Sequence, residues 1–397
     1  MANSFLDNYK ILHEETEVHP EFALWCGLCG MSACLTRSVC LDMGVFQVYP
    51  NLYVVLVAGS GRQRKSTAIG MIERPLQVIE NGPNLIGQKI TPEALINALK
   101  VPIVDGQDNN NDDDSETVSQ GFIVVDELTT LLNRKSYDSG LGALLITLFD
   151  CKDRFEYETR TRGKETLRNM YMGLLGGSTV EGVRRAVPEE AIGEGLTSRI
   201  IFVYVDDPMP PVPRPRTTER KQLALAGVLE HLRLLRDLKG MIALTEEAWE
   251  LYDNEYKIFQ KTSPFWENGL LSGYASRRFV HLLKLGILFA VSDDPLTLRV
   301  SARNLHQAKL TLEETEKNLP RVISMLSTTD GGSNNEFVFS IIEKGKRQGV
   351  SREELIKQAS SRMDYQEIAA AITTLVQGGR IKVRDFGQGK VLLHAVG

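Results

Sequence analysis

The stretch Leu52-Tyr53-Val54-Val55-Leu56-Val57-Ala58-Gly59-Ser60-Gly61-Arg62-Gln63-Arg64-Lys65-Ser66-Thr67 is an apolar, β-branched run that breaks into a glycine turn and ends in Lys-Ser-Thr. A buried strand that leads through such a turn into a helix binds phosphate, because glycines let backbone N–H groups approach the oxygens and the helix adds positive potential. In this pattern Lys65 reaches the β- and γ-phosphates, and the Ser66 hydroxyl ligates Mg²⁺. The residues predicted to surround the phosphates are Gly59, Ser60, Gly61, Arg62, Gln63, Arg64, Lys65, Ser66 and Thr67.

The motif departs from the usual pattern at one position. The glycine expected just before the lysine is Arg64. A glycine turn that ends in Lys-Ser also occurs in ordinary strand-turn-helix connections, so this second interpretation stays open for the stretch considered alone.

A second apolar stretch ends in two adjacent carboxylates. Residues 121–128, with the sequence Gly-Phe-Ile-Val-Val-Asp-Glu-Leu, have the character of a buried parallel strand. Ligand chemistry sits at the carboxyl-terminal edge of such strands in open α/β sheets. We expect Asp126 to hold Mg²⁺ and Glu127 to polarise the water that attacks the nucleotide. The alternative is a strand followed by a capped helix, since aspartate is common before helices.

Length and charge set broad limits on the protein. With 397 residues and 42% hydrophobic content, the chain can bury a large core and is long enough for two or three domains. The formal net charge of −5 does not indicate a bulk polyanion binder, so nucleic-acid contacts would be local. We find no secretory leader and no apolar run of membrane-spanning length, and we therefore expect a cytoplasmic protein without membrane contact.

Four of the five cysteines lie close together, and two of them form a Cys-x-x-Cys pair. Such a pair can indicate a zinc or redox site. The surrounding residues 22–40 are rich in Leu, Ala, Met and Trp and contain no turn between the pair to wrap a metal. Small buried cysteines on an apolar helix are the favoured interpretation of Cys26, Cys29, Cys34 and Cys40.

The order of patterns along the chain predicts five segments. Four apolar strands separated by helices indicate a parallel α/β sheet as the core. Five prolines between 208 and 215 exclude a helix or an interior strand there, which indicates an extended connector. The segments are an N-terminal helical lead-in at 1–49, a core at 50–206, the connector at 207–218, a region that reads as helical throughout at 219–327, and a separate C-terminal unit at 335–397 after a polar linker.

Two features interrupt the core. Residues 105–120 are acidic and almost free of large apolar groups, which predicts a mobile surface loop. Residues 154–168 read as a β-hairpin that turns at Gly163 and has a basic tip.

The C-terminal unit has the pattern of three short helices followed by a β-hairpin, which is typical of a winged helix. If it binds nucleic acid, residues 365–377 are the recognition helix, and Lys382, Arg384 and Lys390 contact phosphate. That helix carries no Lys or Arg, so a unit that mediates protein contacts is an equal alternative.

With these pieces in order, the chain resembles the AAA+-type replicative helicases of phages and mobile elements, in which the Arg-Lys-Ser variant of the phosphate loop recurs. The resemblance covers residues 22–205. It implies an α/β P-loop NTPase with a parallel sheet, a helical lid and a C-terminal winged helix. It also implies a ring, usually a homo-hexamer, that binds ATP and Mg²⁺ between subunits and acts on single-stranded or forked DNA, with a primase or other replication protein as a further partner and the bacterial host cytoplasm as its location.

The resemblance also implies roles for single residues. Lys65 and Ser66 belong to the nucleotide loop, and Asp126 and Glu127 to the metal and water site. Ser178 or Thr179 fits a sensor at the tip of the strand between them, and Arg199 matches the arginine that such rings present to a neighbour's γ-phosphate. Further implied contacts are Arg277 or Arg278 as a lid sensor for phosphate, and Arg160, Arg162 and Lys164 as a pore hairpin that grips DNA.

Each of these implied roles has an alternative. Arg199 could pair with a carboxylate such as Glu194, Arg277 and Arg278 could be plain surface residues, and the hairpin could be an ordinary solvated one. Two other functions also stay open: a helicase loader or remodelling ATPase that does not unwind DNA, and a winged-helix regulator for which nucleotide is a switch. The adjacent carboxylates argue against the switch, which has no need of a water-activating glutamate.

Overall fold

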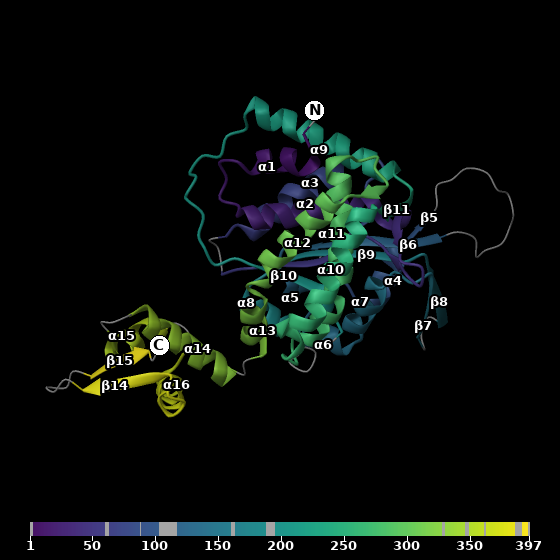
Figure 1. Cartoon of the computed structure of the whole chain (residues 1–397). Coiled ribbons are helices and arrows are strands. Elements are labelled where there is room, and N and C mark those ends of the chain that lie inside the picture. Colours follow the sequence, from purple (N-terminus) through teal and green to yellow (C-terminus); the bar gives the residue numbers. More distant parts are fainter. Residues whose placement is uncertain are drawn as a thin grey trace, which may run out of the picture. The chain divides into compact units, whose positions relative to one another are not determined.

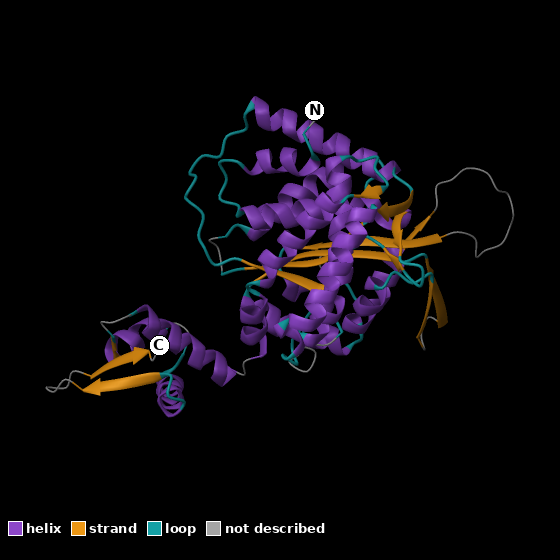
Figure 2. Ribbon diagram, viewed as in Figure 1, coloured by secondary structure: helices purple, strands orange, loops and turns teal. Residues whose placement is uncertain are grey.

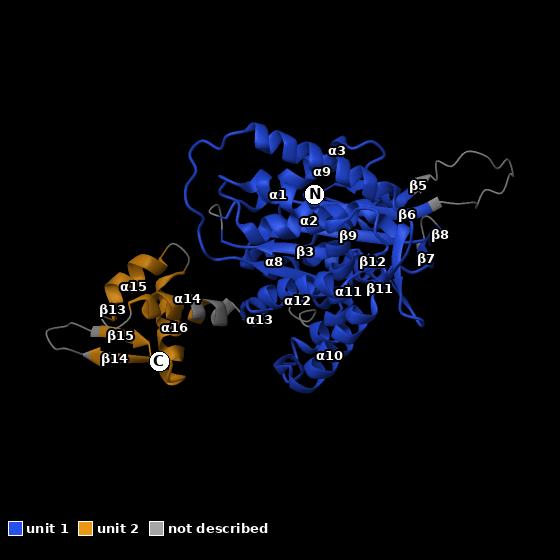
Figure 3. Cartoon of the chain, turned by 45° about the horizontal axis from the view of Figure 1, so that its top comes forward, with its two compact units in different colours: residues 1–326 blue, residues 327–397 orange. Residues whose placement is uncertain are grey.

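The computed structural model describes residues 3–59, 63–87, 89–102, 117–159, 163–187, 195–327, 330–345, 349–360, 363–385 and 391–395. The chain divides into two compact units, Met1–Leu326 and Ser327–Gly397 (Figure 3). None of the helices in these described ranges combines the length and the apolar character needed to cross a membrane.

The first unit is built on a parallel sheet of five strands. They are β3 (Tyr53–Val57), β4 (Leu85–Ile86), β6 (Thr117–Val125), β9 (Tyr171–Ser178) and β10 (Ile200–Tyr204). Their order in the sheet is β10-β3-β9-β6-β4, and β5 (Lys100–Pro102) adds antiparallel to the start of β6. Every residue of β3, β9 and β10 is buried, as expected for parallel strands covered on both faces. The predicted α/β fold with a parallel core sheet is therefore confirmed.

Helices cover both faces of this sheet (Figures 1 and 2). Successive residues of β3 point to opposite faces, so Val54 and Leu56 belong to one hydrophobic core and Val55 and Val57 to the other. The first core is covered by α1 (Phe5–His13), α2 (Pro20–Leu35), α3 (Lys65–Val78), α9 (Glu219–Asp237) and α11 (Ser272–Asp293). The second is covered by α4 (Pro92–Leu99), α5 (Leu128–Leu131), α7 (Leu141–Phe149) and α8 (Val180–Ala186).

A second, smaller sheet joins distant parts of the first unit. Its order is β12-β11-β1-β2, from β1 (Val39–Asp42), β2 (Gln47–Val48), β11 (Gly240–Leu244) and β12 (Arg299–Val300). The prediction that 219–327 is helical throughout is therefore wrong, because β11 and β12 lie within that range, beside α10 (Glu246–Thr262), α12 (Ala302–Glu316) and α13 (Leu319–Ser327). Since β11 pairs in parallel with β1, this region shares a sheet with the N-terminal lead-in.

Helix α2 holds three of the four clustered cysteines. Cys26, Cys29 and Cys34 are buried there, as predicted, whereas Cys40 is partly buried on strand β1, so the prediction of a buried helical position is wrong for Cys40. Burial raises the pKa of the Cys34 thiol to about 12, so this group stays protonated and apolar in the core.

The predicted hairpin is present as β7 (Arg154–Thr159) and β8 (Gly163–Arg168), which pair in antiparallel register from Arg154 with Arg168 to Thr159 with Gly163. Of the residues predicted at its basic tip, Lys164 lies on β8, paired with Glu158, whereas Arg160 and Arg162 lie outside the described residues. The same holds for 103–116, most of the predicted acidic loop, whereas 117–120 belong to β6.

The second unit contains the predicted elements in the predicted order. Helices α14 (Asp330–Lys344), α15 (Arg352–Ala359) and α16 (Tyr365–Gln377) pack with a sheet of order β13-β15-β14. The strands are β13 (Val350–Ser351), β14 (Ile381–Asp385) and β15 (Val391–Ala395). One boundary differs, because α14 begins at Asp330, inside the stretch predicted as a polar linker.

Candidate functional site

The carboxyl-terminal ends of three neighbouring strands bring the predicted site residues together. Strand β9 lies between β3 and β6, with Ser178 paired to Val57 and Gly176 paired to Val125. Continuing this register places Glu127 beside Ser178 at the edge of the sheet. The glycine turn after β3 starts at the same edge, where the backbone N–H of Ala58 donates to the Ser178 carbonyl at 3.3 Å.

The hydroxyl groups of Ser178 and Thr179 make different hydrogen bonds. The Ser178 hydroxyl donates a hydrogen bond of 2.8 Å to Glu127 Oε1. Thr179 instead caps helix α8, and its Oγ1 accepts from the backbone N–H of Gly182 at 2.9 Å. The structure therefore favours Ser178 over Thr179 as the polar contact of the carboxylate pair.

Lys65 is the first residue of α3, and its side chain turns back over the glycine turn. Its Nζ donates to the carbonyl oxygens of Ala58 at 3.1 Å and Gly59 at 3.0 Å. Burial lowers the pKa of Lys65, and the negative charge of Glu127 opposes this effect, so the ammonium and the carboxylate are within electrostatic reach. Ser66 and Thr67 follow as exposed residues on the first turn of this 14-residue helix, where backbone N–H groups are free of intrahelical partners.

The backbone conformation of the residue before Lys65 accounts for the glycine that is usual at this position. Arg64 has a φ of 50° and a ψ of 39°, in the left-handed region that costs a residue with a Cβ about 1–2 kcal/mol. Its guanidinium pairs with Glu17, whose other oxygen accepts from the backbone N–H of Val212 at 3.0 Å. Through Glu17, this ion pair links the turn to the proline-rich connector.

Of the remaining residues of the predicted phosphate loop, the structure describes Gly59 and Gln63. Gln63 is buried, its Nε2 donates to the Asp206 carbonyl at 3.3 Å, and its Oε1 is buried without a hydrogen-bond partner. Residues Ser60, Gly61 and Arg62 lie outside the described part of the chain.

The donors at this edge suit a magnesium ion carried by a nucleotide. Among the described residues, no three His, Cys, Asp or Glu side chains gather as a metal site of their own. Mg²⁺ typically takes one or two carboxylates from a protein and its other ligands from phosphates and water, and Asp126 is exposed at this edge for that role. Burial raises the pKa of nearby Glu73, and the charge of Asp126 adds to the shift.

Two glycines let the strands and helix α8 approach closely. A Cβ on Gly177 would lie 2.6 Å from the backbone oxygen of Asp126, and one on Gly182 would lie 2.4 Å from Ser178 Oγ. These positions are part of the site, although the sequence pattern did not single them out.

The substitution Gly177→Ala is expected to destabilise the first unit by about 1–3 kcal/mol, because the new methyl group must push the end of β6 away. Gly70→Ala is the matched control, since a Cβ there meets nothing within 4 Å and alanine favours a helix by about 1 kcal/mol. Urea unfolding of both variants would measure their free energies of unfolding. Equal stabilities for the two would show that β6 and β9 do not hold this spacing.

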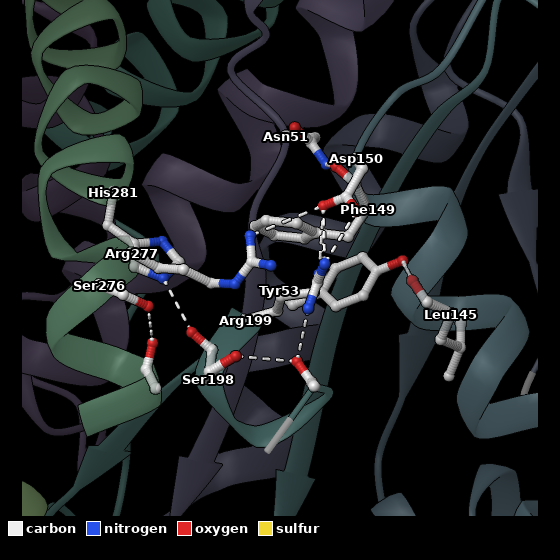
Figure 4. A network of polar contacts seen from close by, with 12 residues as sticks. Asn51, Tyr53, Leu145, Phe149, Asp150, Ser198, Arg199, Ser276, Arg277 and His281 are labelled. Carbon is white, nitrogen blue, oxygen red and sulfur yellow. Dashed lines mark hydrogen bonds and ion pairs between the residues drawn. The ribbon is translucent and has the colours of Figure 1, made fainter. Parts of the chain in front are cut away.

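Two of the predicted arginines, Arg199 and Arg277, lie at the other edge of the sheet, where the strands begin. Arg199 precedes β10 and is 5% exposed. Its Nη2 donates to the two carboxylate oxygens of Asp150 at 3.0 and 2.8 Å, and its Nη1 donates to the Gly195 carbonyl at 2.8 Å (Figure 4). A carboxylate partner was the alternative for Arg199, and the structure supplies Asp150, whereas Glu194 lies outside the described residues.

Arg277 and Arg278 point to different neighbours. Arg277 Nη1 lies 3.7 Å from Asp150 Oδ1, beside Arg199. Arg278 is buried and donates to Glu316 at 2.7 Å. The structure therefore groups Arg277 with Arg199, not with Lys65, and makes Arg278 part of the contact between α11 and α12.

The residues predicted to contact DNA lie in both units. Lys164 is half exposed and pairs with Glu156 at 2.8 Å. Lys382 and Arg384 are exposed on β14, while Arg160, Arg162 and Lys390 are outside the described ranges.

Sequence comparisons add no assignment for this site. No protein-family model matches the chain, and no curated protein matches it either.

Proposed function

We propose that the protein is an AAA+-like P-loop ATPase that assembles into a ring, usually a hexamer, and moves along DNA as a phage or mobile-element replicative helicase. The observation that carries this proposal is the hydrogen bond from Ser178 to Glu127 at the edge where Lys65 also lies. A carboxylate held by a hydroxyl, next to a lysine at a helix N-terminus, is suited to hydrolysis of a nucleoside triphosphate.

Each residue of this edge has a role in the proposed reaction. Lys65 and the backbone of the glycine turn bind the phosphates, while Ser66 and Asp126 would hold Mg²⁺. The metal, when bound, neutralises charge on the phosphate oxygens. Glu127 orients the attacking water and accepts its proton, and Ser178 fixes the direction of that carboxylate.

The proposed DNA contacts differ between the two units. In the first unit, the hairpin β7–β8 lines the pore of the ring through Lys164. In the second unit, which we interpret as a winged helix, the first turn of α16 carries Glu367 in a capping box with Asp364. These acidic groups repel phosphate, so we assign any DNA contact of this unit to Lys382 and Arg384 on β14.

The proposal is tested by measuring ATP hydrolysis and strand separation with and without forked DNA, together with negative-stain imaging in a slowly hydrolysed ATP analogue. Turnover that DNA stimulates, closed rings and strand separation are the expected results. DNA-stimulated turnover without strand separation would instead assign a loader or a remodelling ATPase. Nucleotide binding without turnover would indicate a winged-helix regulator for which the nucleotide is a switch.

The substitution Lys164→Ala is expected to leave basal ATP hydrolysis unchanged and to abolish its stimulation by DNA. The exposed ion pair with Glu156 contributes at most about 1 kcal/mol, so a DNA phosphate can replace it. Lys89→Ala, which removes an exposed lysine that is not part of the hairpin, is the control. Normal unwinding by Lys164→Ala would refute the assignment of the hairpin.

A further inference from the structure

A cavity of about 200 Å³ opens at the edge of the sheet opposite Lys65. Its lining includes Asn51, Phe149, Asp150, Arg277 and Lys284, which come from the start of β3, the end of α7 and the middle of α11. Figure 4 shows how Arg199 and Arg277 approach the same carboxylate of Asp150 at this place.

Positive charge exceeds negative charge around this cavity. Arg277 and Lys284 are the cations among the lining residues and Asp150 is the carboxylate, and a further cation, Arg199, contacts Asp150. Asp150 accepts three hydrogen bonds from Arg199, two at Oδ1 and one at Oδ2, and its Oδ1 lies 3.7 Å from Arg277 Nη1. Two cations therefore share one anion, and the third has no ion pair within the described part of the chain.

Lys284 is the cation without a carboxylate. It is 3% exposed, its Nζ donates to the Asn51 carbonyl at 3.0 Å and to the Asn51 side chain, and it lies 4.2 Å from the centre of the Phe149 ring. Burial lowers its pKa to about 8; the charges of Cys151 and Asp150 oppose this shift, and those of Arg277 and Arg199 add to it. A buried cation that lacks an anionic partner is costly, so the surrounding structure gains if an anion arrives.

Asp150 is placed to move between these cations. It is the C-cap residue of α7, its side chain is 36% exposed, and it lines the same cavity as Lys284. The carboxylate faces open space on the side of this cavity.

We propose that Asp150 is a displaceable counter-ion. It holds Arg199 and Arg277 inside the subunit until a phosphate-class oxyanion takes its place, and its carboxylate then pairs with Lys284 across the cavity. The total charge favours this exchange, because one carboxylate and one multiply charged oxyanion together balance three cations. The source of the oxyanion rests on the proposed function: in a ring, it is the terminal phosphate of a nucleotide held by a second copy of this chain.

The first test does not depend on ATP hydrolysis. It compares thermal unfolding in chloride and in inorganic phosphate at equal ionic strength, with Lys65→Ala in every protein so that phosphate has no lysine to bind at the glycine turn. Asp150→Asn keeps the shape of the side chain but leaves three cations unbalanced. We expect its melting temperature to fall by several degrees in chloride and to recover in phosphate.

The control for this test is Asp138→Asn, which removes an exposed carboxylate at the end of α6 (Arg134–Asp138). Phosphate stabilises folded proteins in general, so the decisive quantity is the difference between the two variants. An equal response to phosphate in Asp150→Asn and Asp138→Asn would overturn the proposal.

The second test concerns Lys284 and also serves if Asp150→Asn does not fold. Lys284→Met keeps a similar side-chain volume without the charge but leaves the Asn51 oxygens without this donor, so circular dichroism must first verify that the variant is folded. We expect kcat for ATP to fall about tenfold with KM unchanged, because the displaced carboxylate has lost its new partner. An unchanged kcat in a folded variant would overturn the exchange. If the wild type hydrolyses no ATP, the proposed function fails, while the phosphate comparison still decides the role of Asp150.

Discussion

Glu127→Gln is expected to lower the rate of ATP hydrolysis by about 10²- to 10⁴-fold while ATP still binds. Glutamine keeps the size of the side chain and an oxygen that can accept the hydrogen bond from Ser178, which is 2.8 Å in the wild type. It lacks the negative charge that orients the water and accepts its proton. The variant should therefore keep the geometry of the site and bind ATP, but hydrolyse it slowly.

Single-turnover hydrolysis and a separate nucleotide titration would measure the two halves of this prediction. Glu80→Gln, which changes an exposed glutamate on the same unit, is the control and should behave as the wild type does. If Glu127→Gln turns over ATP at the wild-type rate, Glu127 does not activate the water, and the site is a nucleotide switch or has another base.

Lys65→Ala is expected to lose ATP binding as well as hydrolysis. A hydrogen bond to a charged group contributes roughly 1.5–3 kcal/mol, so losing two contacts to phosphate oxygens would weaken binding by about 100-fold or more. In the structure Lys65 Nζ binds two carbonyl oxygens of the turn, and the phosphates would replace these partners.

Isothermal titration with ATP and Mg²⁺ would distinguish Lys65→Ala from Glu127→Gln, since only the lysine variant should fail to bind. Lys89→Ala is the matched control, and circular dichroism would verify that each variant is folded. If Lys65→Ala binds ATP with wild-type affinity, the glycine turn is not the phosphate-binding site.

The sequence was most informative where strands are apolar from end to end. Residues 53–57 and 121–125 have the apolar, β-rich pattern of buried parallel strands, which predicts that the polar groups after them meet at one edge of the sheet. The choice between Ser178 and Thr179 was not accessible in the same way, because both side chains stand at the end of β9. It depends on which hydroxyl the first turn of α8 uses as its cap, and that is a property of the folded chain.

The sequence also could not predict which carboxylates the arginines contact. Arg199 and Asp150 are 49 residues apart and meet only because β10 and α7 lie at the same edge of the sheet. Arg277 and Arg278 are adjacent, but successive residues on a helix point about 100° apart, so one reaches Asp150 and the other Glu316. The helix pattern alone could not tell which arginine takes which direction.

The strand β11 was missed for a local reason. Its five residues, Gly240–Leu244, lie between two long helices and are too few to interrupt a helical pattern. What makes them a strand is the distant partner β1, to which each of residues 240–242 is paired.

That pairing also sets the order in which a ribosome can complete the fold. Helix α2 and strand β1 are made early, but β11, α9 and α11 follow roughly 200 residues later. At a synthesis rate of about 5–20 residues per second, this delay is about 10–40 s. During this time α2, whose residues from Trp25 to Leu35 are all buried in the finished protein, lacks the cover that α9 and α11 supply and is a natural client for a chaperone that binds nascent apolar helices.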